Sequence, residues 1–369
     1  MTQAAFRGSV CLLLMLALCA TAVAATDYSS SLKSGRAELK SAGALAFGPD
    51  GILFVGDSIG AAIFALDTED RKQGASAARL DVKAINEKIA ALLGTAADQI
   101  LINDLAVNPI SKKAYLSVSR GRGPSATPLI LRVDPSGKIG EFSLDNVKYS
   151  RVALPNAPDP DAKDRRGQSP RLESITDLAY VDGRVFVAGL SNEEFASNLR
   201  AIPFPFTQAD KGATVEIYHG SHGRFETNAP VRTFVPYAIK AEPYILAAYT
   251  CTPLVKFPVS QLKPGAKVMG TTIAELGNRN RPLDMIVYQK GGKDFILMNN
   301  SSRGVMKMST EKIETYQGIT EQTEIKGLPY ETIAELKGVE QLDRLDNEKA
   351  VILVRGEGGS LDLKTIALP

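Results

Sequence analysis

The sequence predicts an all-β fold, a six-bladed β-propeller with four-stranded blades, from three observations. A unit of short apolar strands joined by tight turns recurs six times along the chain. The turns between the first two strands of three units read PDG, VDG and KGG, residue types that favour hairpins. Three segments that contain Ala-Glu-Leu each stand before a unit, which is the place of an outer strand that leads into the next blade.

The six units follow one another from residue 44 onward. Each has an apolar strand, a turn, a second apolar strand, a polar loop and a third strand, as in ALAFGPDG, ILFVGDS and AAIFALD of the first unit. The first strands are expected to start at Ala44, Asp104, Asp177, Val235, Asp284 and Glu340.

The outer strands predict how the ring closes. Two of them begin at Ile273 and Ile333, and the third, RAELKSAGAL from Arg36, precedes the first unit. The last unit has no fourth strand of its own. We therefore expect the N-terminal segment around residues 37–39 to complete the last blade and close the ring.

The units resemble those of TolB-like six-bladed propellers, which include NHL-repeat proteins and gluconolactonase-like lactonases. The motifs that carry the resemblance are F-x-P-D-G from Phe47 and V-x-D-S from Val55. The resemblance implies a propeller over the whole mature chain, and the lactonases of this group hold a divalent cation in the central channel. The fold by itself does not decide the function.

The first 25 residues predict a secretory signal peptide. An Arg at position 7 precedes an apolar run from Val10 to Leu18 and the small residues Ala22 to Ala25. We expect a secreted or periplasmic protein in which residues 26–369 form a single propeller domain. No second apolar segment is long enough to predict a membrane span.

The balance of charges argues against nucleic acid and anionic membranes as partners, and the cysteine content argues against an internal disulfide. The chain has 43 basic and 41 acidic residues, so no broad field favours nucleic acid or anionic membrane. Of the 3 cysteines, Cys11 and Cys19 lie in the predicted signal peptide. Cys251 is then the sole cysteine of the mature chain, and we expect a free thiol.

Two insertions predict a decorated face. Residues 81–94 have the apolar spacing of a short amphipathic helix that ends at Gly94, and residues 154–171 form a long charged loop rich in proline. Both connect a fourth strand to the next first strand. In a propeller such connections share one mouth of the channel with the loops that follow the second strands.

Three aspartates occupy the same position in three units and are the candidate metal-binding and catalytic residues. Asp104, Asp177 and Asp284 each stand at the start of an innermost strand, with Glu340 or Gln341 in that place in the sixth unit. Crowded carboxylates raise one another's pKa or bind a cation, and an oxygen-rich cluster suits Ca²⁺. In the alternative interpretation each Asp caps its own turn.

A second set of polar residues follows the second strands and predicts a ligand-binding mouth. Its members are Asp57, Arg120, Asn299 and Arg355, in loops that also contain Ser191-Asn192 and Thr250-Cys251. The two arginines would donate to a carboxylate or phosphate. Solvation alone explains polar loops equally well.

The two histidines, His219 and His222, lie in YHGSHGRFE, which lacks the helix and the glutamate spacing of a zinc protease motif. We expect ordinary loop residues, one of which is placed to act as a base near the mouth. The aspartates from Asp159 onward lack the glycine and the final glutamate of a calcium loop, which indicates a solvated loop.

Two functions remain from the sequence. One is a cation-assisted hydrolase of lactones or esters, in which Ca²⁺ polarises a carbonyl and an aspartate is the general base. The other is a non-catalytic propeller that binds a small polar molecule or a protein at the channel mouth. The three equivalent aspartates favour a cation-containing ligand site.

Overall fold

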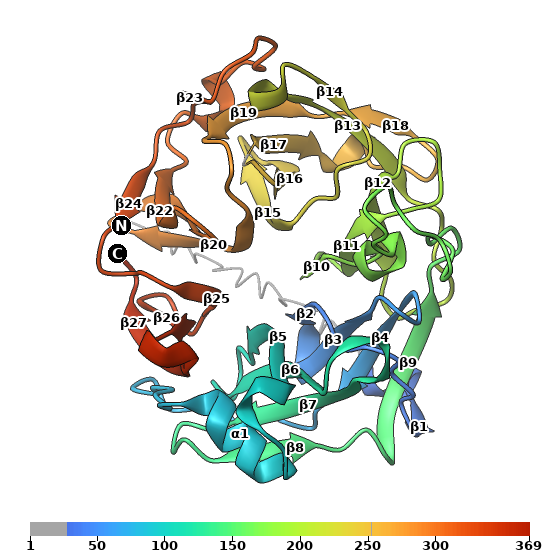
Figure 1. Ribbon diagram of the computed structural model, residues 1–369, viewed down its shortest axis with the longest axis vertical. Helices are drawn as coiled ribbons and strands as arrows, with labels where there is room; N and C mark the ends of the chain where they lie inside the picture. The colour runs from blue at the N-terminus through green and yellow to red at the C-terminus, as the bar shows by residue number, and fades with distance from the viewer. Residues whose placement is uncertain (1–27, 252) are drawn as a thin grey trace, which may run out of the picture.

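The computed structural model describes residues 28–251 and 253–369, and there the chain forms a ring of six antiparallel sheets (Figure 1). Each sheet is one blade, and each of the six repeat units supplies the three inner strands of a blade. The prediction of a six-bladed propeller is therefore confirmed. The expected signal peptide, residues 1–25, lies outside the described residues.

We number the blades I to VI in chain order. Blade I contains β2 (Leu45–Phe47), β3 (Ile52–Asp57), β4 (Ala62–Asp67), β9 (Val147–Ala153) and β1 (Lys33–Gly35). Blade II contains β5 (Ile100–Val107), β6 (Ala114–Arg120), β7 (Thr127–Val133) and β8 (Ile139–Phe142). Blade III contains β10 (Asp177–Val181), β11 (Arg184–Leu190), β12 (Ser197–Pro203), β13 (Ala213–His219) and β14 (Arg224–Glu226), with β18 (Lys267–Met269) parallel to β13.

The other three blades follow the same plan. Blade IV contains β15 (Thr233–Ile239), β16 (Glu242–Ala248), β17 (Pro253–Pro258), β19 (Thr271–Leu276) and β23 (Ile325–Gly327). Blade V contains β20 (Pro282–Lys290), β21 (Lys293–Asn300), β22 (Gly304–Ser309) and β24 (Glu331–Ile333). Blade VI contains β25 (Val339–Arg344), β26 (Lys349–Arg355) and β27 (Leu361–Ala367). Short 3₁₀ helices occupy Tyr28–Ser31, Pro49–Gly51, Ala97–Gln99, Gly123–Ser125, Pro170–Glu173, Gly220–His222, Val259–Gln261, Ile313–Thr315 and Glu357–Gly359.

The order of the blades around the ring differs from their order along the chain. The innermost strand of blade II contacts those of blades I and VI, and that of blade I also contacts blade III. The ring order is therefore I, III, IV, V, VI, II (Figure 1). The chain leaves blade I after β4, builds blade II, and returns as β9, which pairs with β4 as the fourth strand of blade I.

The last blade is closed by residues 79–84 and not by the segment expected from the sequence. Val82 and Leu363 exchange two backbone hydrogen bonds of 2.8 and 2.9 Å, and the Leu80 N–H donates to Thr365 Oγ1 at 2.6 Å. Residues 37–39 instead follow β1, which pairs with β9 at the outer edge of blade I. The expectation for residues 37–39 was wrong because blade II sits beside blade VI, so the connection into blade II covers that edge.

Six apolar clusters hold the ring together, one between each pair of neighbouring blades. Helix α1 (Ile85–Leu93) confirms the predicted amphipathic helix: Ile85 and Ile89 are buried in the cluster between blades II and VI. Gly94 ends the helix with φ of 63°, a conformation that glycine adopts without strain. Full burial of an isoleucine side chain such as these contributes about 1.5–3 kcal/mol to the stability of the fold. Among the described residues no helix has the length and apolar character needed to cross a bilayer.

Candidate functional site in the central channel

The three aspartates singled out in the sequence reach the channel with threefold spacing. Asp104, Asp177 and Asp284 lie on the innermost strands of blades II, III and V, which are every second blade around the ring. All three line the same two channel cavities. The expectation that they approach one another from equivalent positions is confirmed.

Each of these carboxylates joins its own blade to the next one. Oδ1 accepts the N–H of the following residue, at 2.7 Å in all three cases. Oδ2 accepts a backbone N–H from the innermost strand of the next blade: Leu45 at 2.6 Å, Phe234 at 2.7 Å and Leu342 at 2.9 Å, in that order. Oδ1 thus makes a local backbone bond, as the capping interpretation expected, but the three aspartates share the channel, which that interpretation did not expect. Oδ2 makes a contact between blades that the sequence did not indicate.

A fourth carboxylate, Asp343, belongs to the same set and was missed. Its two oxygens accept the N–H groups of Arg344, at 2.6 Å, and of Val107 in blade II, at 2.7 Å. By strand register Gln341 holds the place of Asp284, since both directly follow a β-bulge. Asp343 comes two residues later and therefore lies on the same face of β25. We call Asp104, Asp177, Asp284 and Asp343 the carboxylate ring.

Glu340 does not join the carboxylate ring, which corrects the prediction. It is the unpaired residue of the β-bulge in β25, where the regular alternation of faces is interrupted. Its carboxylate pairs with the Arg355 guanidinium, Nη2 to Oε2 at 2.9 Å, in a groove between blades V and VI. The ion pair with Arg355 is what separates Glu340 from the carboxylate ring.

The carboxylate ring carries raised pKa values. Burial raises the pKa of Asp177 to about 7 and that of Asp343 to about 6. The pKa values of Asp104 and Asp284 lie well above the usual range, because burial is reinforced by the charges of the other ring members. Among the described residues no lysine, arginine or histidine forms an ion pair with any of the four.

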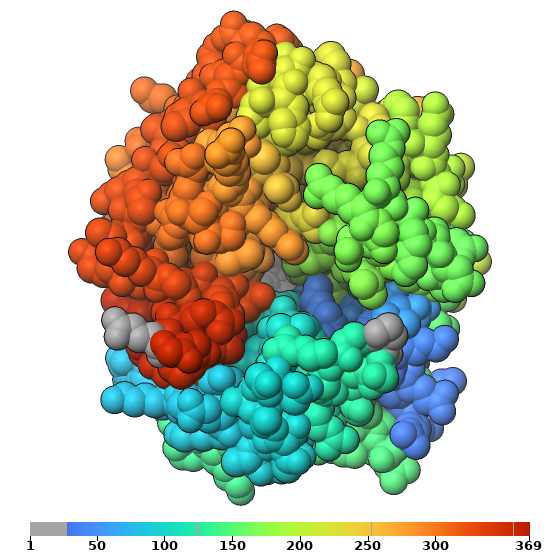
Figure 2. Space-filling model, in the orientation of Figure 1, coloured from blue at the N-terminus to red at the C-terminus, as the bar shows by residue number. Residues whose placement is uncertain are grey.

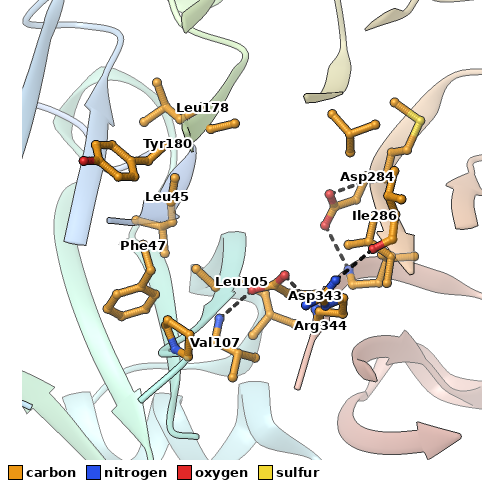
Figure 3. A pocket seen from close by; sticks show the side chains of 18 of the residues that line it. Leu45, Phe47, Leu105, Val107, Leu178, Tyr180, Asp284, Ile286, Asp343 and Arg344 are labelled. Atoms are coloured by element: carbon orange, nitrogen blue, oxygen red, sulfur yellow. Dashed lines mark hydrogen bonds between the residues drawn. The ribbon is translucent and has the colours of Figure 1, made fainter. Parts of the chain in front are cut away.

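The carboxylate ring forms the floor of a wide chamber of about 730 Å³ that opens among the turns of the inner hairpins. Alternate residues of the innermost strands point into it, namely Leu45, Phe47, Leu105, Val107, Tyr180 and Ile286 (Figure 3), while Lys112, Arg344, Asp346 and Asn347 add polar groups to its lining. Arg344 stands beside Asp343 in the same view. The space-filling view shows one face of the molecule hollowed where the blades meet (Figure 2).

A smaller polar chamber of about 150 Å³ lies at the other end of the same carboxylates, where the innermost strands begin. Asn103, Gln341, Arg232 and Arg281 line it. Arg232 is paired with Glu173 at 2.5 Å, whereas Arg281 has no ion-pair partner among the described residues. Burial and the neighbouring Arg232 lower the pKa of the Arg281 guanidinium.

The four expected ligand-binding residues do not surround either chamber. Asp57 is buried and accepts the N–H groups of Lys40, Ser41 and Gly60, so its role is to fix a loop. Asn299 is buried and donates to the Val339 carbonyl in blade VI.

The two arginines of that set also lie away from the chambers. Arg120 is exposed at the end of β6, and Arg355 pairs with Glu340 in the outer groove. The expectation of a ligand-binding mouth made of these residues was wrong, because the loops after the second strands lie outside the strands that line the channel.

Comparison with known proteins gives no family. No family model matches the chain, and no curated protein matches it, so the resemblance to NHL-repeat and gluconolactonase-like proteins stays a prediction. Among solved structures, a putative oxidoreductase (glucose dehydrogenase) of Thermus thermophilus is 12% identical with a TM-score of 0.36, and the match covers 91% of this chain and 100% of that one.

Two further structures are similar at the same level. The PQQ-bound aldose sugar dehydrogenase of Streptomyces coelicolor is 10% identical with a TM-score of 0.34, and the match covers 90% of this chain and 96% of that one. The hydrazine synthase of Kuenenia stuttgartiensis is 10% identical with a TM-score of 0.38, over 90% and 97% of the two chains. Likeness at these TM-scores carries no argument about function.

Proposed function

We propose that the protein is an exported binding propeller whose wide chamber takes a small organic molecule with an apolar body and a positively charged group. The observation that carries the proposal is the carboxylate ring itself: four acids face a chamber, and none of them forms an ion pair with a described residue, although Arg344 and Lys112 also line the chamber. A bound ammonium group would supply the missing charge and favour the ionised form of the ring.

The chamber suits such a ligand in size and lining. Small-molecule sites commonly enclose roughly 300–1,000 Å³, with apolar walls and a few convergent polar groups. The wide chamber falls in that range, and Phe47, Val107 and Tyr180 are among the side chains that would contact an apolar body. Every ring oxygen already accepts one backbone N–H, so the ring can attract a cation without rearranging.

Ca²⁺, with the lactone or ester hydrolysis expected from the sequence, is the rival occupant. It needs six to eight oxygen ligands at short distance. Each ring oxygen has one lone pair left beyond the N–H that it accepts, so the ring would have to bring several of these lone pairs, from different blades, to a short distance from one ion. An organic cation makes no such demand.

The test compares benzylamine with benzyl alcohol, which has the same shape and no charge, and with CaCl₂. We expect benzylamine to raise the melting temperature and the alcohol to leave it unchanged, by an amount that follows RT ln(1 + [L]/Kd). Binding should weaken as the pH falls through about 7, because Asp177 then becomes protonated. Stabilisation by CaCl₂ alone would favour the hydrolase, and no response to any of the three would leave the carboxylate ring a structural feature.

Two variants make the test specific. Asp284→Asn should weaken the benzylamine response, because it removes one ring charge. Asp145→Asn is the matched control: its side chain is 69% exposed and pairs with Arg36 on the outer surface, so the response should be unchanged. Export is tested separately, by sequencing the N-terminus of the protein recovered outside the cytoplasm.

A further inference from the structure

Two histidines and the free cysteine, far apart in the sequence, come together at the rim between blades III and IV. His219 ends β13 and His222 lies in the turn that leads to β14, while Cys251 follows β16 of the next blade (Figure 1). One ligand atom from each lies within 4.8 Å of the other two. We call these three residues the histidine–cysteine cluster.

A single glutamate orients both imidazole rings. Glu226 Oε2 accepts from Nδ1 of His219 at 2.8 Å, and Oε1 accepts from Nδ1 of His222 at 2.7 Å. The ring centroids are 3.9 Å apart, and the ring planes are tilted by 37° to each other. A carboxylate bonded to one ring nitrogen fixes the tautomer and leaves the other nitrogen, Nε2, with a free lone pair, which is the usual arrangement around metal-binding histidines.

The free nitrogen of His219 has no partner. The side chain is 2% exposed, and its Nε2 is buried without a hydrogen bond to any described residue. A buried acceptor left unpaired destabilises the fold, because it has lost its hydrogen bond to water. Packing of the two rings explains their contact but leaves this lone pair unsatisfied, whereas a bound ion would satisfy it.

Backbone hydrogen bonds fix both arms of the cluster. The Gly220 N–H donates to the buried Glu275 at 2.6 Å, and a Cβ at residue 220 would lie 2.8 Å from Cγ of that glutamate. On the other arm the Cys251 N–H donates to the Asn280 carbonyl at 2.6 Å. Cys251 has φ of 61°, a left-handed conformation uncommon outside glycine. The backbone that carries His219 and Cys251 is therefore held in place before any ion arrives.

We propose that His219, His222 and Cys251 bind a transition-metal ion through the two Nε2 atoms and the thiolate, with a fourth position open to solvent beside His222. Imidazole and thiolate donors select Zn²⁺ or copper and not Ca²⁺ or Mg²⁺. Binding releases the thiol proton to solvent, and no electron is transferred. This site is separate from the wide chamber and does not depend on its ligand.

The experiment uses the purified protein, stripped of metal by a chelator and then incubated with Zn²⁺, Cu²⁺, Co²⁺ or Ca²⁺. After desalting we expect one equivalent of Zn²⁺ or copper and no Ca²⁺ by elemental analysis. Co²⁺ should give a thiolate-to-metal charge-transfer band. Alkylation of Cys251, mapped by mass spectrometry to distinguish it from Cys11 and Cys19, should slow at least about tenfold when Zn²⁺ is bound, since only the free thiolate reacts.

The variants separate binding from folding. Cys251→Ser and His222→Gln should lose the retained ion, and Glu226→Gln should weaken binding roughly 10–100-fold by releasing the ring orientation. Asp145→Asn is again the control: its side chain is 69% exposed and pairs with Arg36, away from the cluster, so it should keep full binding. Failure of the wild-type protein to retain any transition metal, or equal retention by His222→Gln, would overturn the proposal.

Discussion

The carboxylate ring and the histidine–cysteine cluster differ in how their polar atoms are satisfied. Each ring oxygen accepts a backbone N–H, and the four bonds to the Oδ2 atoms join neighbouring blades. In the cluster only the Nδ1 atoms are bonded, and the buried Nε2 of His219 is left over. The ring is thus part of the fold and attracts a ligand by its charge, while the cluster contributes little to the fold and offers donor atoms directly.

The first way to test this contrast is to delete one side chain from each region. Asp104→Ala leaves the N–H groups of Leu45 and Leu105 without their acceptor, so we expect a loss of roughly 2–3 kcal/mol in the free energy of unfolding. Cys251→Ala in metal-free protein should change it by less than about 0.5 kcal/mol. Urea denaturation measures both. Equal losses would show that the cluster is also structural.

The second test uses pH. The pKa of Asp177 is raised from 3.8 to about 7, so between these values the folded state holds a proton that the unfolded chain has released. Stability from this group is complete below pH 3.8 and is lost as the pH rises through about 7. We expect a fall of about 1–2 kcal/mol between about pH 5 and about pH 8.

Asp177→Asn provides the control for the pH test. Asn does not titrate, so the variant should lose that part of the pH dependence, while Cys251→Ala should keep it. Denaturation curves at the two pH values decide the matter. A fall of the same size in wild type and Asp177→Asn would assign the pH dependence to other groups.

The third test asks whether the charges of the ring aspartates interact with one another. The charge of Asp104 contributes to the raised pKa of Asp284. Near pH 8, Asp104→Asn and Asp284→Asn each relieve the same repulsion, so the double variant should be about 0.5–1 kcal/mol less stable than the sum of the single effects predicts. The pair Asp104→Asn and His222→Gln, which spans the two regions, should be additive within about 0.5 kcal/mol.

The two regions also differ in how far the sequence predicted them. The repeat placed Asp104, Asp177 and Asp284 in the channel because equivalent positions in a ring point the same way. It missed Asp343, which stands two residues after the repeat position. The cluster was not predicted, because His222 and Cys251 come from different blades and meet only through the packing of β13–β14 against the loop after β16.

The order of the blades around the ring could not be predicted from the sequence repeat either. Six units in a row predict six blades, but nothing in the local pattern of residues 147–153 says that this strand returns to β4. Because β9 returns to blade I, the connection into blade II passes the free edge of blade VI, and Val82 pairs there with Leu363. The prediction that residues 37–39 close the ring was wrong for this reason. Local strand patterns specify each blade, whereas the order of blades depends on which edges remain free when the ring forms.

The last and smallest test concerns Glu340, which the sequence assigned to the ring and the structure places with Arg355. The pair is partly exposed, with side chains 33% and 48% accessible, and pairs of this kind contribute little. Glu340→Gln should therefore cost no more than about 0.5 kcal/mol, and salt should reduce even that difference because it screens exposed charges. Neither the benzylamine response of the wide chamber nor metal retention by the cluster should change, since Glu340 lines neither site. Calorimetric titration of the variant with benzylamine, beside Asp284→Asn, measures this. If Glu340→Gln weakened binding as much as Asp284→Asn, the outer groove between blades V and VI would be coupled to the carboxylate ring, and the separation between a structural surface pair and a charged channel would fail.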